Sequence, residues 1–241
     1  MSGTLRTFAF AQQWGPMAGF QRLVQGAVAA PAQGPWLPCG IFKSGSVEIE
    51  GSATTIAAAV RLANTLSCPL NGYTVQIGGT VTVGDVVSVT VTSSVAGSVT
   101  ASHTVASGDT LNGIAASLAA TLQANAALAA AGFIVNEGSA IVTMEFPSLA
   151  PGQEWQGGGM ALDTFATAPP INSVSIAANV SGAATETATL GVVSNGTTML
   201  TLSNSAPHSV LAGLPARWVQ GVVTTLTGAG GGINVNFAGV A

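Results

Sequence analysis

Charged side chains are scarce in this chain of 241 residues: Asp, Glu, Lys and Arg together make up 6%, against roughly a quarter in an ordinary soluble domain. The five Lys and Arg are scattered, which argues against a nucleic-acid-binding protein, because counterion release from phosphates needs clustered basic residues. Disordered chains combine low hydrophobicity with high charge. This chain has 48% apolar residues and little charge, so we expect it to fold.

Long apolar runs and cysteines are also few. The Ala-rich stretch 110–136 is interrupted by Asn, Gln, Ser and Gly, so it lacks the roughly 20 continuous apolar residues of a membrane-spanning helix. The N-terminus lacks the basic start and apolar stretch of a secretory signal. Cys39 and Cys68 form neither a disulfide framework nor a metal-ligand set, and the sequence leaves open whether they pair. We expect a protein made in the cytoplasm, with no membrane segment, cofactor or metal.

Short β-rich runs dominate both ends of the chain after Trp36. Val47 and Ile49 alternate with Glu48 and Glu50, as in a strand with one covered face. The C-terminal segment contains five further runs separated by Gly, Asn, Ser and Pro, a spacing typical of a β-sandwich or barrel. These runs are "SVSIAANV", "TATLGVV", "TTMLTLS", "RWVQGVVTTLT" and "GGINVNFAGV".

The middle of the chain, from about residue 71 to 146, has a different pattern. Two strand-like stretches, "YTVQIGGTVTVGDVVSVTVTS" and "VTASHTV", precede a helical period, and "FIVNEG" with "AIVTMEF" comes after it. Asp109 or Thr110 is a suitable N-cap for the helix. Apolar residues then fall at i, i+3, i+4, i+7 and i+11, which predicts one amphipathic helix laid on a sheet. They are Leu111, Ile114, Ala115, Leu118 and Leu122.

The predicted fold is therefore mainly β: a β-sandwich built from the N- and C-terminal segments, with an inserted α+β module containing one amphipathic helix. We assign residues 1–36 to an N-terminal arm, 37–70 plus 165–241 to the sandwich, 71–150 to the inserted module and 151–164 to a linker. Two consecutive domains are the alternative.

The first 36 residues carry aromatic side chains that would be costly to leave in water. They either pack on their own domain or lie on a neighbouring copy, where aromatic anchors dominate interface energy. The candidate self-association residues are Phe8, Phe10, Trp14, Phe20 and Trp36.

The segment "HTVASGDTLNGIAA" resembles the opening of a LysM module, a family that binds N-acetylglucosamine chains. That resemblance implies a glycan- or peptidoglycan-binding adhesin acting through residues 103–124. The chain after this segment departs from the LysM pattern, because we predict one longer helix from about Thr110 to Ala124 and then a hairpin. We therefore interpret the motif as a capped strand-to-helix turn. The matching residues are His103, Val105, Gly108, Asp109, Thr110, Leu111, Ile114 and Ala115.

Residues 72–146, with "GGTVTVGDVVSVTVTS" before the helix and hairpin, resemble a domain that recurs in tail and other virion proteins of tailed bacteriophages. The outer segments "GPWLPCGIFKSGSVEIEG" and "LAGLPARWVQGVVTTLTGAGGGINVNFAGV" are similar to small phage β-sandwich proteins that decorate capsids or build tails. The resemblance implies a non-enzymatic, multicopy virion protein assembled in the host cytoplasm. Its partners would be copies of itself and major capsid or tail proteins.

Residues suited to catalysis are few, and we predict no catalytic, cofactor-binding or metal-binding residue. His103 is interpreted as an ordinary strand residue and His208 as a turn residue. Glu48 and Glu50 share one strand face and could bind a cation, but a solvated face is the simpler interpretation. The glycine-rich stretch 228–234 lacks Lys and leads into a strand, so it is predicted to be a hairpin tip. A hydrolytic enzyme would need an acid/base pair in a cleft.

Overall fold

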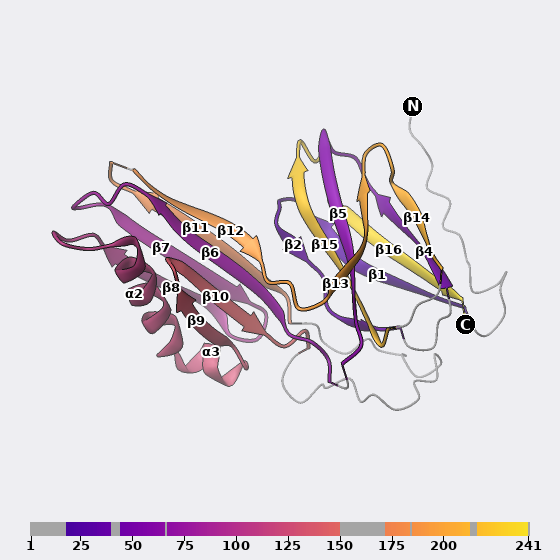
Figure 1. Cartoon of the computed structure of the whole chain (residues 1–241), viewed down its shortest axis with the longest axis horizontal. Coiled ribbons are helices and arrows are strands. Elements are labelled where there is room, and N and C mark those ends of the chain that lie inside the picture. The colour runs from indigo at the N-terminus through magenta and orange to yellow at the C-terminus, as the bar shows by residue number, and fades with distance from the viewer. Residues whose placement is uncertain are drawn as a thin grey trace.

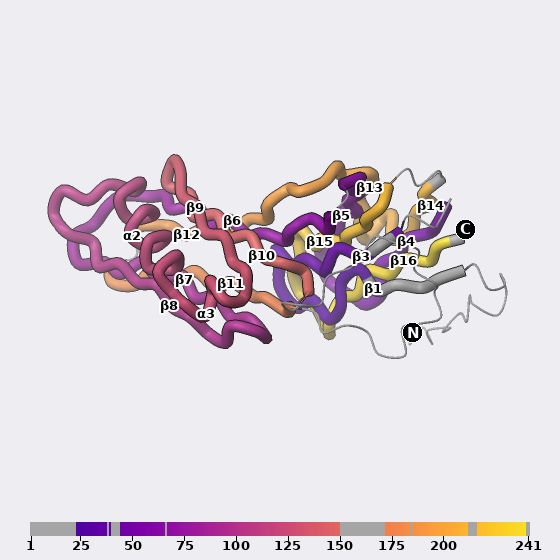
Figure 2. Tube along the Cα trace, turned by 90° about the horizontal axis from the view of Figure 1, so that it is seen from below, coloured from indigo at the N-terminus to yellow at the C-terminus, as the bar shows by residue number. Residues whose placement is uncertain are grey.

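The computed structural model describes residues 18–39, 44–65, 67–149, 172–183, 185–212 and 216–240. The chain forms two bodies, a sandwich of strands and an α+β module, arranged along the long axis of the molecule (Figures 1 and 2). The described part is mainly β, with antiparallel sheets and two helices, which confirms the predicted fold class. Ala18 pairs with Val240, so both ends of the described chain meet in the sandwich.

The sandwich consists of two antiparallel sheets. The first has the order β1 (Ala18–Ala27), β16 (Ile233–Val240), β4 (Ser44–Glu50) and β14 (His208–Ala212). The second has the order β13 (Thr197–Ser203), β5 (Thr55–Ala63), β15 (Trp218–Thr227) and β2 (Ala32–Gln33), and β3 (Leu37–Pro38) also pairs with β15. Alternate residues from both sheets form one core, among them Val47, Val60, Val219, Val235 and Phe237.

The module also contains two antiparallel sheets. One has the order β12 (Glu186–Val192), β6 (Asn71–Gly79), β10 (Ile141–Phe146) and β9 (Ile134–Gly138). The other has the order β11 (Val174–Ser181), β7 (Val86–Ser93) and β8 (Gly97–Thr104). Helix α2 (Leu111–Gln123) packs against the edge strands β8 and β9, while β11 lies beside β12. The two sheets and the helix thus surround a single apolar core.

Helix α2 has the predicted apolar stripe, since Ile114, Ala115, Leu118 and Leu122 are buried. The prediction of a single helix up to about residue 124 was incomplete. Helix α2 ends at Gln123 and a short helix α3 (Ala126–Ala130) comes next. Asn125 is the N-cap of α3, because its side chain accepts hydrogen bonds from the N–H groups of residues 127 and 128.

The pairing corrects two predicted domain boundaries. Residues 18–36 were assigned to an arm, but β1 and β2 are integral strands of the sandwich. Residues 174–192 were assigned to the sandwich, but β11 pairs with β7 and β12 pairs with β6, inside the module. Strand pairing over such distances is not encoded in local pattern, so alternation alone could not assign these strands to a sheet. The predicted linker, 151–164, lies outside the described residues.

Uncharged polar groups join the two bodies. The side-chain amide of Gln220 on β15 donates to Asn71 Oδ1 at 2.8 Å and to the carbonyl oxygen of Gly34 at 3.0 Å. Ser148 Oγ donates to the same Asn71 oxygen at 3.2 Å and accepts from the Trp36 backbone N–H at 3.1 Å. Gln220 and Asn71 are 1% and 4% exposed, so water does not replace these bonds.

A buried cation lies at the same junction. Arg61 on β5 is 6% exposed, and its Nη1 donates to the Val193 carbonyl at 2.7 Å, directly after β12. Burial lowers the pKa of the guanidinium below its ordinary value. The contact attaches the second sheet of the sandwich to the end of the module.

Replacing Gln220 with Ala is expected to destabilise the chain by about 1–3 kcal/mol, because two buried acceptors each lose one of their donors. Urea unfolding followed by circular dichroism measures the change. Thr224→Ala on the same strand is the matched control, since it removes an exposed hydroxyl that donates to the Ala57 carbonyl. Equal effects of the two substitutions would contradict the role given to the junction.

Candidate functional site

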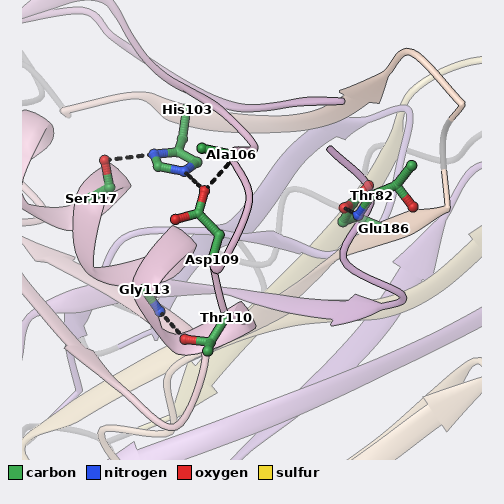
Figure 3. Close-up of polar contacts among 8 residues, drawn as sticks. All are labelled: Thr82, His103, Ala106, Asp109, Thr110, Gly113, Ser117 and Glu186. Atoms are coloured by element: carbon green, nitrogen blue, oxygen red, sulfur yellow. Dashed lines mark hydrogen bonds and ion pairs between the residues drawn. The ribbon is translucent and has the colours of Figure 1, made fainter. Parts of the chain in front are cut away.

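The segment that joins β8 to α2, within the LysM-like motif, contains several polar side-chain contacts (Figure 3). Gly108 turns the chain with φ of +92°, a value that favours glycine. Thr110 is the N-cap, and its Oγ1 accepts from the Gly113 N–H at 3.1 Å. Asp109 Oδ2 accepts from the Ala106 N–H at 2.7 Å. The predicted capped turn is therefore present.

His103 connects this turn to the helix. Its Nε2 lies 2.8 Å from Asp109 Oδ2, and its Nδ1 lies 2.9 Å from Ser117 Oγ (Figure 3). The Ala106 N–H, followed by His103, holds the pKa of Asp109 below its ordinary value, so the carboxylate is ionised and only accepts. In the neutral imidazole, Nε2 therefore carries the hydrogen and Nδ1 accepts from the Ser117 hydroxyl.

A Ser–His–Asp group invites comparison with a hydrolytic triad. In that mechanism the imidazole faces serine through Nε2 and aspartate through Nδ1, the reverse of the arrangement around His103. Stabilising the oxyanion also requires free N–H donors beside the nucleophile. Ser117 lies within α2, where backbone N–H groups bond to carbonyls one turn earlier. The geometry suits a tether between strand, turn and helix better than an acyl-transfer site.

Sequence reasoning missed this tether. His103 was interpreted as an ordinary strand residue, and Ser117 and Gln123 lie outside the predicted apolar stripe. In the structure Ser117 bonds to His103 on β8, while Gln123 Nε2 donates to the Val135 carbonyl on β9 at 2.7 Å. The two polar residues therefore attach α2 to the strands on either side of it. Their place beside the stripe was the available signal.

The five candidate self-association residues fall into three groups. Phe8, Phe10 and Trp14 lie outside the described residues. Phe20 belongs to β1, where it pairs with Ala238. Trp36 is fully buried, and its Nε1 donates to the Leu70 carbonyl at 3.3 Å, so it packs inside its own chain at the junction of the two bodies.

The acidic pair on β4 lies on one strand face, as predicted. Glu48 Oε2 is 3.8 Å from His208 Nδ1, and both side chains are exposed. Glu50 Oε2 accepts from Asn236 Nδ2 at 3.0 Å. Each carboxylate thus contacts a different neighbour. The glycine-rich stretch that begins at Gly228 connects β15 to β16, but these strands lie in different sheets of the sandwich. The predicted hairpin tip is therefore wrong: the stretch is a crossing from one sheet to the other, and local turn composition does not distinguish the two.

Cys39 and Cys68 are free thiols, which answers the question of pairing that the sequence left open. Burial raises the pKa of each thiol to about 12, so both stay protonated at neutral pH. Within the described ranges, no three His, Cys, Asp or Glu side chains gather closely enough to hold a metal ion. The described helices are also too short or too polar to span a membrane.

Two edge strands of the sandwich expose apolar side chains. Val210 on β14 is 74% exposed and Met199 on β13 is 48% exposed. The two strands are consecutive in the chain and form neighbouring edges of the two sheets (Figure 1). Among the described residues, no strand pairs with the outer side of either one. We call this lateral surface, β13 with β14, the β13/β14 edge.

Comparison with known proteins gives no match: no family model, no curated protein and no solved structure matches this chain. Functional inference therefore depends on the geometry of the chain itself and on the resemblances in its sequence.

Asp109→Asn is expected to destabilise the chain at neutral pH. It should also make the stability of the chain fall less as the pH is lowered. A carboxylate with a lowered pKa stabilises the fold above its ordinary value of 3.8, and that stability is lost as pH falls through the lowered value. The difference in urea midpoint between wild type and variant should therefore shrink from pH 7 to pH 3. Glu137→Gln, an exposed acid on β9, is the control. A difference in urea midpoint that stays constant with pH would contradict the stabilising role of the ionised Asp109 carboxylate.

Proposed function

We propose that this chain is a non-enzymatic structural protein that self-assembles into a multicopy virion component, decorating or stabilising a phage capsid or forming part of a tail. The observation that carries the proposal is the β13/β14 edge, which presents apolar side chains and strand edges with little charge. The virion setting comes from the sequence resemblance, as do the partners: copies of the chain and major capsid or tail proteins.

The direction in which the backbone N–H and C=O groups of β14 point supports edge pairing. The Ile49 N–H donates to the Pro207 carbonyl at 2.9 Å, and His208 pairs with Glu48. Hydrogen-bonded pairs alternate along an antiparallel ladder. The backbone groups of Ser209 therefore face β4, while those of His208 and Val210 face away from the sheet. An open row of this kind is a template for a strand of another molecule.

The composition of this edge favours pairing. Natural edge strands discourage association with Lys, with Pro or with a bulge, whereas β14 reads His-Ser-Val-Leu-Ala and pairs with β4 without a bulge. Antiparallel pairing of two β14 strands about a two-fold axis centred on Val210, the middle residue of the strand, places the two Val210 residues opposite each other. The net charge of −4 adds little long-range repulsion between copies.

Val210→Lys tests the proposal. Two opposed lysines repel and are hard to bury, so the dissociation constant for self-association should rise at least about tenfold, equivalent to about 1.4 kcal/mol. Multi-angle light scattering across a dilution series of the full chain measures the constant. Val28→Lys is the matched control, because Val28 is also 74% exposed but lies after the end of β1, outside any strand.

Association weakened by Val210→Lys and retained by Val28→Lys would support assembly through β14. A wild-type chain that stays monomeric at every concentration would contradict self-assembly. Equal weakening by both lysines would instead indicate a general effect of charge and remove the edge from the proposal.

A further inference from the structure

Two carboxylates are buried at one end of the module core. Asp85 is 2% exposed and Glu186 is 3% exposed. Asp85 extends the β7–β8 ladder, because its carbonyl accepts from the Val105 N–H. Its side chain lies on the same strand face as that of the buried Val87, two residues later. Glu186 begins β12 in the same phase as Leu190, which packs on the core. Since side chains alternate along a strand, both carboxylates point inward.

Each carboxylate lies at one of two connections between the module sheets and accepts from the backbone of the other connection. Asp85 Oδ1 accepts from the Ala183 N–H at 2.5 Å and Oδ2 from the Thr185 N–H at 3.3 Å, both in the connection between β11 and β12. Glu186 Oε1 accepts from the Thr82 N–H at 2.6 Å, in the connection between β6 and β7 (Figure 3). The described residues of the two connections, 80–85 in one and 182, 183 and 185 in the other, are here called the module tip.

The second oxygen of Glu186 has no partner among the described residues. Its Oε2 is inaccessible to solvent and makes no hydrogen bond with any described residue. No Lys or Arg in the described part of the chain forms an ion pair with Glu186. A buried carboxylate oxygen left alone is costly, and native structures satisfy such groups with a proton, a water or an ion.

The surroundings of Glu186 favour an ion with oxygen ligands. The Thr80 carbonyl accepts from Thr185 Oγ1 at 3.0 Å and from Thr82 Oγ1 at 3.3 Å, and the two hydroxyls contact each other. Carboxylate, carbonyl and hydroxyl oxygens are ligands of hard cations, whereas zinc and copper favour nitrogen and sulfur. The buried charge of Asp85 on the same tip adds electrostatic attraction for a cation.

We propose that the module tip binds a hard divalent cation of the Ca²⁺ type, with Glu186 Oε2 as the anionic ligand. Thr82, Thr185 and water supply neutral oxygens, in the flexible coordination that Ca²⁺ accepts. The site has few charged ligands, so the affinity is weak, with a dissociation constant of about 10⁻⁴–10⁻³ M. The ion would fasten the two turns at the end of the module core.

The experiment uses the full chain, first dialysed against EDTA. Thermal unfolding is followed with CaCl₂ increasing to about 10 mM, since a ligand that binds only the folded state raises the midpoint with concentration. NaCl of equal ionic strength separates binding from screening. The wild-type midpoint should rise with Ca²⁺ and rise less with Mg²⁺, which demands a stricter geometry. Glu186→Gln should lose the rise, and Glu137→Gln, the same change on an exposed strand, should keep it.

A wild-type midpoint that does not depend on Ca²⁺ would overturn the proposal, and so would an equal rise in both Gln variants. If a proton occupies the second oxygen instead of an ion, the wild-type midpoint does not depend on Ca²⁺ and Glu186→Gln is as stable as wild type. If Glu186→Gln does not fold, Thr185→Val replaces it, because Thr185 is exposed and its hydroxyl is replaced by a methyl group of similar size. A reduced rise with Thr185→Val then supports the site, and an unchanged rise contradicts it.

Discussion

Hydrogen bonding at strand edges is the constraint that shapes this molecule. Each sheet has two edge strands with a row of backbone N–H and C=O groups that need partners. Proteins commonly protect such edges with charged side chains, but only 6% of this chain is charged. The chain covers some edges with its own elements, and the β13/β14 edge is the described open edge through which we propose that copies pair.

The module illustrates the covered case. Helix α2 lies against β8 and β9, the edges of two different sheets, and it is attached by neutral side chains on both sides of its apolar stripe. Uncharged side chains also form the hydrogen bonds at the junction, where Gln220, Asn71 and Ser148 join the two bodies. Hydrogen bonds between neutral groups act only at short range and add little to the electrostatic potential outside the molecule. The sandwich illustrates the open case at the β13/β14 edge.

The fold class and the helix could be predicted from sequence because their signals are local. The stripe from Leu111 to Leu122 has one period, and the hairpin of β9 and β10 is two short runs around a turn. The partners of β1, β11 and β12 could not, because these strands bond to residues far away in the sequence. Alternation defines a covered face but not which sheet the strand joins.

The candidate sites show the same division. The N-cap was predicted to be Asp109 or Thr110 and is Thr110, since capping depends on neighbours three or four residues away. The contacts of His103 with Ser117 and of Glu186 with Thr82 were not, because they form only when strands and helix have packed. Trp36 was interpreted as a candidate surface anchor, yet it is buried between the two bodies.

Residue-resolved amide hydrogen exchange in β14, at low and high protein concentration, tests the central claim most directly. The Ser209 and Leu211 amides face β4 and should be protected at both concentrations. The His208 and Val210 amides face outward and should become protected only as the concentration rises. Fast exchange of those two amides at every concentration would contradict assembly through this edge.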